Sequence, residues 1–247
     1  RELRKENGEL CVIFVNTVIS ALLFILGNVK KNIGYNREGR GFLLDFSPEI
    51  NYHKHYINRY AFLFNEYIGN KYVYLPELSL RYTGQKTFQF DNSHKTIALY
   101  LGGENKEFRK YPDEYAVQLL RLLNRQGYNL LLIGDENDNI KHTQYAEEAR
   151  IDHLINLTAR TTIEGFINTI ANVDLIITID SSALHIAAAV KTPFIALMGL
   201  STSPTSTILP KVPLGRILKI ENNLIREEDY IRNITPDLIL KTISELI

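Results

Sequence analysis

The sequence predicts an α/β protein whose C-terminal part is a doubly wound parallel sheet. From Lys95 onward, short apolar runs of strand length alternate with amphipathic segments of helix length. The strand-like runs are apolar throughout, which is typical of strands covered by helices on both faces. Several of these runs end in Gly, Asp or Ser, and ligands of open parallel sheets bind at the carboxyl ends of the strands.

The composition is that of an ordinary globular protein. The 247 residues are 45% hydrophobic and 23% charged, which excludes a disordered or collagen-like chain. The 28 basic and 28 acidic residues cancel, so the net charge gives no reason to expect a nucleic-acid partner. The single cysteine, Cys11, has no internal disulfide partner and fits a reducing compartment. The only methionine is Met198, so we expect that a segment precedes Arg1 or that the chain was processed.

The N-terminal part is expected to be an incomplete second α/β domain. Its longest apolar run, 10–26, is shorter than the roughly 20 residues of a membrane span and contains polar interruptions. We interpret the run as a buried strand, a turn at Asn16 and an apolar helix that ends at Gly27; a membrane-associated segment is the alternative. The next expected elements are a strand at 29–35 and a helix within 53–67, whose aromatic stripe we assign to the core.

The two parts meet in a mixed, turn-prone stretch. We assign residues 1–80 to the partial N-terminal domain, 81–94 to a linker and 95–247 to the C-terminal domain. The expected strands of the C-terminal domain are 96–101, 129–133, 154–157, 174–179, 193–198 and 217–220. The expected helices are one between Pro112 and Gly127, 140–149, one opened by a Thr161–Glu164 capping box, 183–190 and one from Thr235.

Two strand ends and one loop carry residues that could take part in a ligand site. The first strand ends in Gly102 and Gly103, which let a ligand approach the backbone. The second ends in the acidic stretch 134–138. The basic pair Arg109 and Lys110 lies in the loop after the first strand, either as a phosphate-binding arm or as a solvated surface pair.

A third strand end is the most informative, because the strand runs directly into a helix through Asp180, Ser181 and Ser182. The free N–H groups and the dipole of a helix N-terminus suit a phosphate. His185 follows within the first turns of the same helix. The alternative is purely structural, with Asp180 as the helix N-cap and His185 as a buried histidine.

The segment 174–189, DLIITIDSSALHIAAA, resembles the strand–D-[ST]-G-x-x-H-[IL]-A-x-A element of glycosyltransferase family 9, the heptosyltransferases of lipopolysaccharide synthesis. The glycine pair followed by 109–112 is similar to that family's small-residue strand end and K-x-[WY]-P loop, and 31–44 resembles the end of its acceptor domain. The family's first strand, Gly-rich acceptor loop and catalytic aspartate have no counterpart here. We therefore expect the chain to lack the start of the N-terminal domain.

The resemblance implies a two-domain GT-B fold, with the nucleotide sugar in the C-terminal domain and the acceptor in the N-terminal one. It implies an inverting, metal-independent transfer of a sugar, heptose from ADP-heptose, to a lipopolysaccharide core acceptor without a cofactor. Glu136 or Asp138 would hold the ribose and Thr161 would lie near the base. The residues implied for the nucleotide sugar are Gly102, Gly103, Glu136, Asp138, Thr161, Asp180, Ser181, Ser182, Ala183 and His185.

The same resemblance assigns four basic residues. Arg109, which stands at the family's lysine position, and Lys110 would stabilise the leaving diphosphate. Arg37 and Arg40 are candidates for binding acceptor phosphates, with a solvated loop as the alternative.

Two other functions stay open on the sequence alone. One is a non-catalytic or truncated nucleotide-sugar-binding remnant of the same family, and the other is a GT-B enzyme that uses a different nucleotide. A heptosyltransferase is expected in the cytoplasm, where activated sugars are made. It would have no transmembrane segment and would contact the inner membrane peripherally through its lipid acceptor.

Overall fold

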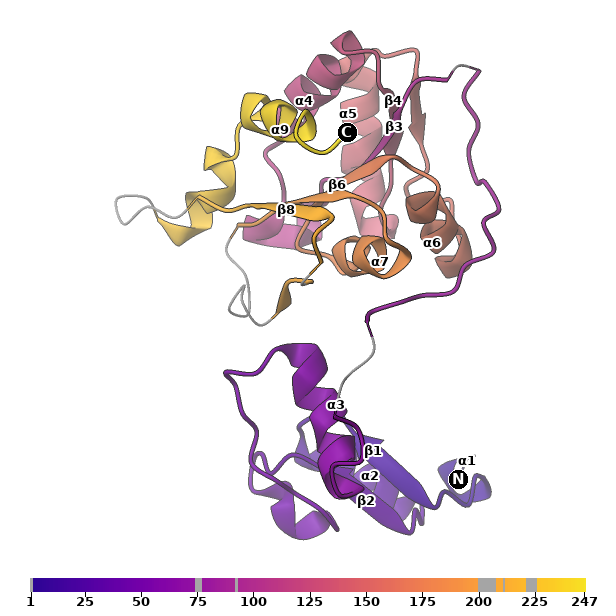
Figure 1. Cartoon of the computed structure of the whole chain (residues 1–247), viewed down its shortest axis with the longest axis vertical. Coiled ribbons are helices and arrows are strands. Elements are labelled where there is room, and N and C mark those ends of the chain that lie inside the picture. Colours follow the sequence, from indigo (N-terminus) through magenta and orange to yellow (C-terminus); the bar gives the residue numbers. More distant parts are fainter. Residues whose placement is uncertain (1, 74–76, 92, 200–207, 211, 221–225) are drawn as a thin grey trace. The chain divides into compact units, whose positions relative to one another are not determined.

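The computed structural model describes residues 2–73, 77–91, 93–199, 208–210, 212–220 and 226–247. The chain divides into two compact units (Figure 1). The first unit extends to Glu77, and the second begins at Leu78.

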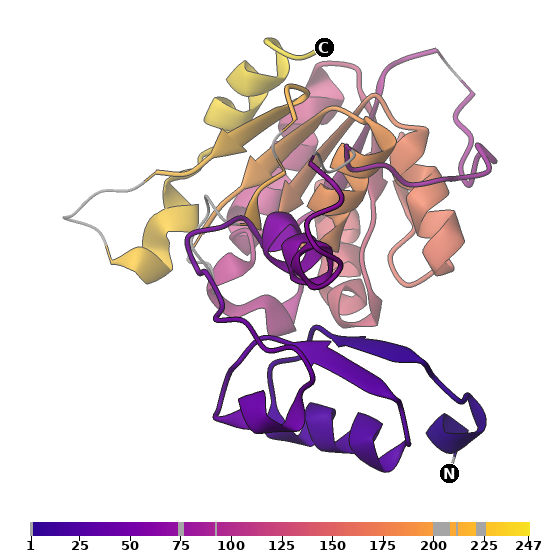
Figure 2. The ribbon, with the colours of Figure 1, turned by 60° about the horizontal axis from the view of Figure 1, so that its bottom comes forward.

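The first unit contains the expected strand–turn–helix element. Strands β1 (Leu10–Ile13) and β2 (Lys31–Gly34) pair in parallel, and helix α2 (Val18–Leu26) connects them. The Thr17 side chain caps α2 by accepting a hydrogen bond from the Ser20 backbone N–H. Figure 2 shows α2 and α3 on opposite sides of this small sheet. The remaining helical segments are α1 (Glu2–Lys5), η1 (Arg40–Leu43) and α3 (Tyr56–Tyr67). Of the helices described, none has the length and apolar character needed to cross a bilayer.

The aromatic stripe of α3 packs only in part as the sequence predicts. Tyr60 and Tyr67 are half-buried and contact the rings of Phe14 and Phe46. Tyr56 and Phe64 are 37% and 38% exposed, whereas Arg59 and Leu63 are buried. The core assignment therefore fails at Tyr56 and Phe64; the buried Arg59 guanidinium lies 4.5 Å from the centre of the Tyr56 ring.

The second unit is built on one parallel sheet of six strands in the order β5-β4-β3-β6-β7-β8. The side chains of the four central strands are buried along their whole length, as the continuous apolar runs predict. The strands are β3 (Thr96–Tyr100), β4 (Asn129–Leu132), β5 (Leu154–Asn156), β6 (Leu175–Ile179), β7 (Phe194–Leu197) and β8 (Gly215–Leu218).

Helices cover both faces of this sheet (Figures 1 and 2). Helix α4 packs against α5 and α9, and α6 packs against α7. The helices are α4 (Asp113–Arg125), α5 (Asn139–Ala149), α6 (Ile163–Ala171), α7 (Ser182–Val190) and α9 (Pro236–Ile243). Three 3₁₀ segments accompany them: η2 (Glu104–Arg109), η3 (Glu136–Asp138) and η4 (Glu227–Asn233). The second unit is therefore doubly wound.

The strand order reverses between β3 and β6. The chain steps outward from β3 to β4 and β5, then returns to place β6 on the other side of β3. At such a switch point the connections leave in opposite directions, and a crevice opens outside the carboxyl ends of the two strands. The fold thus puts the ends of β3 and β6, with their glycine and serine residues, at one place.

The segment assigned to a linker is fastened to the second unit. The backbone N–H groups of Thr83 and Gly84 both donate to Asn168 Oδ1 at 3.1 Å, and Asn168 Nδ2 donates to Thr83 Oγ1 at 2.8 Å. The Thr87 and Thr169 hydroxyls lie 2.6 Å apart. These residues of 81–94 therefore lie along α6, an arrangement that composition alone does not reveal.

The capping box expected at Thr161–Glu164 is displaced by one residue. Thr162 is the N-cap of α6, and its hydroxyl accepts a hydrogen bond from the Gly165 N–H at 3.1 Å. Adjacent threonines offer equivalent caps, and the burial of the helix decides which of them is used.

Replacing Asn168 with alanine tests the attachment of 81–94 to α6. Loss of three hydrogen bonds should lower the free energy of unfolding by about 2 kcal/mol and speed amide exchange around Thr83. Asn172→Ala is the control, because Asn172 donates to the Asn168 carbonyl and its side chain makes no hydrogen bond to the described residues of 81–94. Equal exchange rates around Thr83 in the two variants would contradict the attachment.

Candidate functional site

Two glycines form the floor of the crevice at the switch point. Gly102 has φ +80°, and a Cβ there would lie 2.7 Å from Ile179 Cδ1 at the end of β6. A Cβ at Gly103 would lie 2.3 Å from the Asn137 carbonyl oxygen. Distances below 3 Å are clashes, so a side chain fits at neither position. The backbone at the end of β3 is therefore buried and closely packed, between β6 on one side and η3 on the other.

Ser181, rather than Asp180, caps helix α7. The Ser181 hydroxyl accepts a hydrogen bond from the Ala183 N–H at 3.2 Å and lies 3.0 Å from the Thr178 hydroxyl. The structural alternative, in which Asp180 serves as the N-cap, is therefore wrong. Other N–H groups of the first turn of α7 lack intrahelical acceptors, and with the helix dipole they suit an anion.

The other residues predicted at this corner surround the start of α7. Ser182 is its first residue and is exposed, and Ala183 is buried behind it. Asp180 and His185 are half-buried, and each takes part in further polar or electrostatic contacts. His185 is therefore not the fully buried histidine of the structural alternative.

Arg109 is the last residue of η2, and the backbone is held in place both before it, at Phe108, and after it, at Tyr111. A Cβ at Gly199, just beyond β7, would lie 2.7 Å from the Phe108 carbonyl oxygen, so η2 meets the carboxyl end of that strand. Tyr111 is fully buried; its N–H donates to the Leu101 carbonyl at 3.0 Å, and its hydroxyl donates to the Ile234 carbonyl at 2.8 Å. The half-buried Arg109 side chain has no ion-pair or hydrogen-bond partner among the residues that the structure describes.

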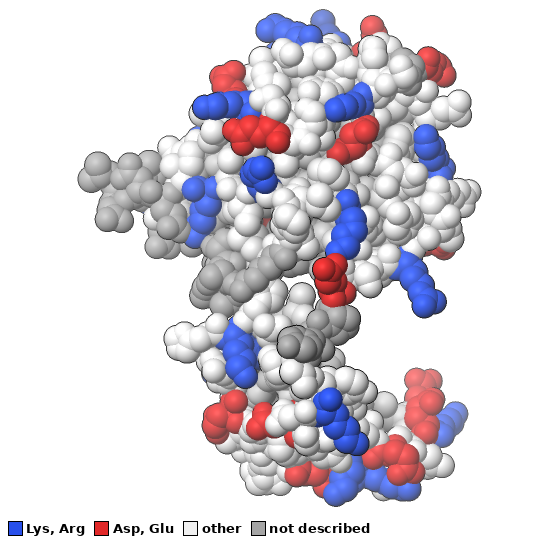
Figure 3. Space-filling model, in the orientation of Figure 1, with Lys and Arg blue, Asp and Glu red and all other residues white. Residues whose placement is uncertain are grey.

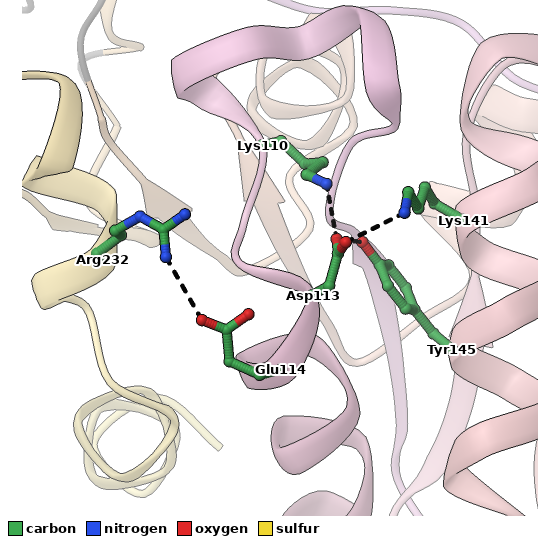
Figure 4. Close-up of polar contacts among 6 residues, drawn as sticks. All are labelled: Lys110, Asp113, Glu114, Lys141, Tyr145 and Arg232. Carbon is green, nitrogen blue, oxygen red and sulfur yellow. Dashed lines mark hydrogen bonds and ion pairs between the residues drawn. The ribbon is translucent and has the colours of Figure 1, made fainter.

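Lys110, in contrast, is committed to Asp113 (Figure 4). Lys110 Nζ lies 2.7 Å from Asp113 Oδ1, Lys141 Nζ lies 3.1 Å from Asp113 Oδ2, and the Tyr145 hydroxyl also donates to this carboxylate. Burial raises the pKa of Asp113, but hydrogen bonds from Lys110, Tyr145 and Lys141 outweigh it and lower the pKa to about 2. The two predicted cations thus differ: Arg109 can turn to a ligand, and Lys110 anchors the loop.

The two ribose candidates in the acidic turn after β4, Glu136 and Asp138, differ in burial. Asp138 is fully buried; its Oδ2 accepts a hydrogen bond from the Asp135 N–H at 3.0 Å, and its Oδ1 has no partner. A Cβ at Gly103 would lie 2.9 Å from Asp138 Oδ1. Glu136 is exposed. Asp138 therefore caps its own turn and packs against Gly103, and of the two ribose candidates Glu136 is the one whose carboxylate is exposed.

Thr161 lies farther along the same edge of the sheet. It is half-buried and immediately precedes Thr162, the N-cap of α6. It follows β5, the second neighbour of β3 in the sheet. With roughly 5 Å between neighbouring strands, the ends of β5 and β3 are separated by about 10 Å, a distance that a nucleotide can span.

The two arginines predicted for the acceptor lie in the first unit and differ in burial. Arg37 is exposed, and its guanidinium lies 5.3 Å from the centre of the Tyr52 ring. Arg40 has no exposed surface, and burial lowers its pKa. It donates hydrogen bonds to Tyr35 O, Val15 O, Thr17 O, Ser20 Oγ and Asn16 Oδ1. Arg40 therefore holds the turn after β1, and with no exposed surface its guanidinium is not presented to an acceptor.

The sequence analysis did not single out Lys106, which also belongs to this site. Its ammonium pairs with Asp135 Oδ2 at 3.1 Å, and its Cβ and Cγ pack against Gly102. The available signal was a third basic residue in the loop that carries Arg109 and Lys110. Charges of both signs are intermixed over the face of the second unit drawn in Figure 3, so the grouping is not visible as a patch. In the part of the chain that the structure describes, no three His, Cys, Asp or Glu side chains group as metal ligands.

Comparison with known proteins gives consistent results. The model of glycosyltransferase family 9 (heptosyltransferase) matches residues 1–228. Lipooligosaccharide heptosyltransferase 2 of Haemophilus influenzae is 26% identical over 269 residues, which cover 98% of this chain and 78% of that protein.

Two solved structures share the fold. ADP-heptose lps heptosyltransferase II of Escherichia coli superposes with a TM-score of 0.83 and 21% identity over 99% of this chain and 78% of that one. Escherichia coli heptosyltransferase WaaC with ADP-2-deoxy-2-fluoro heptose superposes with a TM-score of 0.74 and 16% identity over 98% of this chain and 75% of that one. They confirm the predicted α/β fold class with parallel sheets.

The pKa of Asp113 predicts how stability depends on pH. Because the pKa is lowered from its unfolded value near 4 to about 2, the stabilisation is present above about pH 4 and is lost as the pH falls toward 2. The side chain is 42% exposed, so solvent screening reduces the effect to about 1 kcal/mol. Urea unfolding of Asp113→Asn should show this deficit at pH 7 and a shrinking one at pH 3.

Glu114→Gln is the matched control, since Glu114 and Arg232 are 65% and 60% exposed and lie 3.4 Å apart. Such a pair contributes little in water. A deficit for Asp113→Asn that is equal at pH 7 and pH 3, or equal to that of Glu114→Gln, would contradict the assignment.

Proposed function

The chain belongs to glycosyltransferase family 9, the heptosyltransferase family, and from this membership we propose that it transfers heptose from ADP-heptose to a lipopolysaccharide core acceptor. The related protein of Haemophilus influenzae is a lipooligosaccharide heptosyltransferase, and a solved relative of the same fold holds ADP-2-deoxy-2-fluoro heptose. Both names support a nucleoside-diphosphate sugar as donor and a saccharide of the outer-membrane lipid as acceptor.

The observation that carries the proposal is the glycine pair beside the N-terminus of α7. Gly102 lies against the last residue of β6, and Ser182 begins the helix three residues later in the chain. A diphosphate placed beside Gly102 would face the first-turn N–H groups of α7 and the positive end of its dipole.

In the proposed reaction, an acceptor hydroxyl oxygen attacks the anomeric carbon of the donor. The bond from that carbon to the diphosphate oxygen breaks, and its electron pair leaves with ADP while the hydroxyl proton passes to a general base or to water. A single displacement from the opposite face inverts the configuration. Negative charge grows on the leaving oxygen, where a cation and aligned N–H groups stabilise the transition state most. The Arg109 guanidinium, which can donate two hydrogen bonds to one phosphate, would supply the cation.

The remaining predicted residues take roles consistent with their exposure. The exposed Glu136 carboxylate would accept hydrogen bonds from the ribose hydroxyls, and Thr161 would lie near the base. Arg37 would bind an acceptor phosphate from the first unit. We propose that the reaction needs neither cofactor nor metal, and that it takes place in the cytoplasm at the inner membrane, where the donor and the lipid acceptor meet.

Arg109→Ala tests the assigned cation. Loss of charge-assisted hydrogen bonds to a phosphate should weaken ADP binding about tenfold, and Arg109→Lys should retain part of the affinity. Titration calorimetry measures both. Arg121→Ala is the control, because Arg121 is an exposed residue of α4 that donates to the Glu148 carbonyl. An ADP affinity of Arg109→Ala equal to that of the control would remove Arg109 from the site.

The identity of the nucleotide has its own test. Thermal unfolding should shift upward with ADP-heptose or ADP, since a ligand that binds the folded state stabilises it, and should shift less with UDP- and GDP-sugars at the same concentration. A larger shift with a UDP- or GDP-sugar would replace the donor assignment while leaving the diphosphate site in place.

A further inference from the structure

We propose that Lys106 is a second cation for the donor diphosphate, paired with Asp135 in the free protein and with a phosphate oxygen once the donor is bound. The inference rests on the proposed function and adds a residue to its site. It is drawn from the position of one lysine side chain relative to the glycine pair.

The stem of Lys106 lies on the floor of the crevice. Its Cγ and Cβ are 3.1 and 3.3 Å from the point where a Cβ of Gly102 would be. The same point is 2.7 Å from Ile179 Cδ1, at the end of β6. Lys106 and the strand that leads into α7 therefore contact the same glycine from different sides. A diphosphate on that glycine would touch the lysine stem.

The Lys106 ammonium points toward β4 in the free protein. Its Nζ lies 3.1 Å from Asp135 Oδ2 and 5.7 Å from the centre of the Tyr100 ring. The ends of β4, β3 and β6 are neighbours in the sheet, separated by roughly 5 Å each. A lysine side chain is about as long as one such step, so rotation about its own bonds can bring the ammonium over the crevice without moving the backbone.

The present partner of Lys106 is one that a phosphate can replace. The Asp135 side chain is 48% exposed and the Lys106 side chain 20%, so water reaches the pair from the carboxylate side and screens it. A charge-assisted hydrogen bond to a phosphate in a crevice is stronger. The Asp135 carboxylate would keep the hydrogen bond that its Oδ1 accepts from the Asn137 N–H at 2.8 Å. The exchange therefore leaves no buried charge unpaired.

Other cations near the loop are less available. Lys110 and Lys141 share the Asp113 carboxylate, which has a lowered pKa and stays ionised at neutral pH (Figure 4). Lys106 and Arg109 lie three residues apart in η2, so one short segment carries both cations that can turn. Two cations suit a diphosphate, since Arg109 can meet the leaving oxygen while Lys106 meets the other phosphate.

The test compares Lys106→Gln with Asp135→Asn in the whole chain, with ADP as the probe. Asparagine keeps the oxygen that accepts from the Asn137 N–H and removes only the charge that competes for Lys106. Calorimetry should show ADP binding about five- to tenfold weaker in Lys106→Gln and unchanged or tighter in Asp135→Asn. Adenosine, which has no phosphate, should bind all three proteins equally.

A purely structural ion pair gives a different pattern, in which both variants weaken ADP binding to the same extent; this result would overturn the inference. An ADP affinity of Lys106→Gln equal to that of the unmodified chain would also overturn the inference. It would leave the role of Arg109 and the proposed function unaffected. If the unmodified chain binds none of ADP, UDP and GDP, the proposed function itself fails, and the role of Lys106 fails with it.

Discussion

The reversal of strand order between β3 and β6 is the constraint on which the site depends. It brings the carboxyl ends of two strands together while their connections leave in opposite directions. The backbone after β3 is then confined between Ile179 and Asn137, where only glycine fits. Glycine beside the start of a helix is required here by packing, and glycine is also the residue that lets an anionic ligand approach the main chain. Packing and binding therefore demand the same two residues, Gly102 and Gly103.

The charged side chains near the ends of β3 and β6 differ in the partners that they bind. Asp113 takes two lysines and a tyrosine, and it fixes the loop after η2 to α5. The Asp138 carboxylate accepts a hydrogen bond from the Asp135 N–H within its own turn, whereas Glu136 is exposed. Arg109 keeps its guanidinium uncommitted within the described residues. The anionic groups thus hold the scaffold in place, and in the proposed complex the cationic groups of η2 turn to the diphosphate.

The fold could be predicted because it depends on patterns that a sequence displays directly. Continuous apolar runs, with helices of 3.6-residue period between them, specify the buried strands such as β6 to within a residue or two. The exact N-cap residues could not be predicted from the sequence. Asp180 and Ser181, like Thr161 and Thr162, are equally good caps, and only the three-dimensional structure shows that Ser181 and Thr162 are used. Arg40 and Lys106 depend on partners far along the chain, and charge alone does not tell a buried anchor from a free cation.

A crystal structure of the chain with ADP bound is the most direct measurement of the central claim. The account predicts the diphosphate at the switch point, with phosphate oxygens about 2.7–3.2 Å from main-chain nitrogens at the start of α7 and in contact with Gly102. A diphosphate bound elsewhere on the second unit, with side chains filling the corner between β3 and α7, would contradict the account.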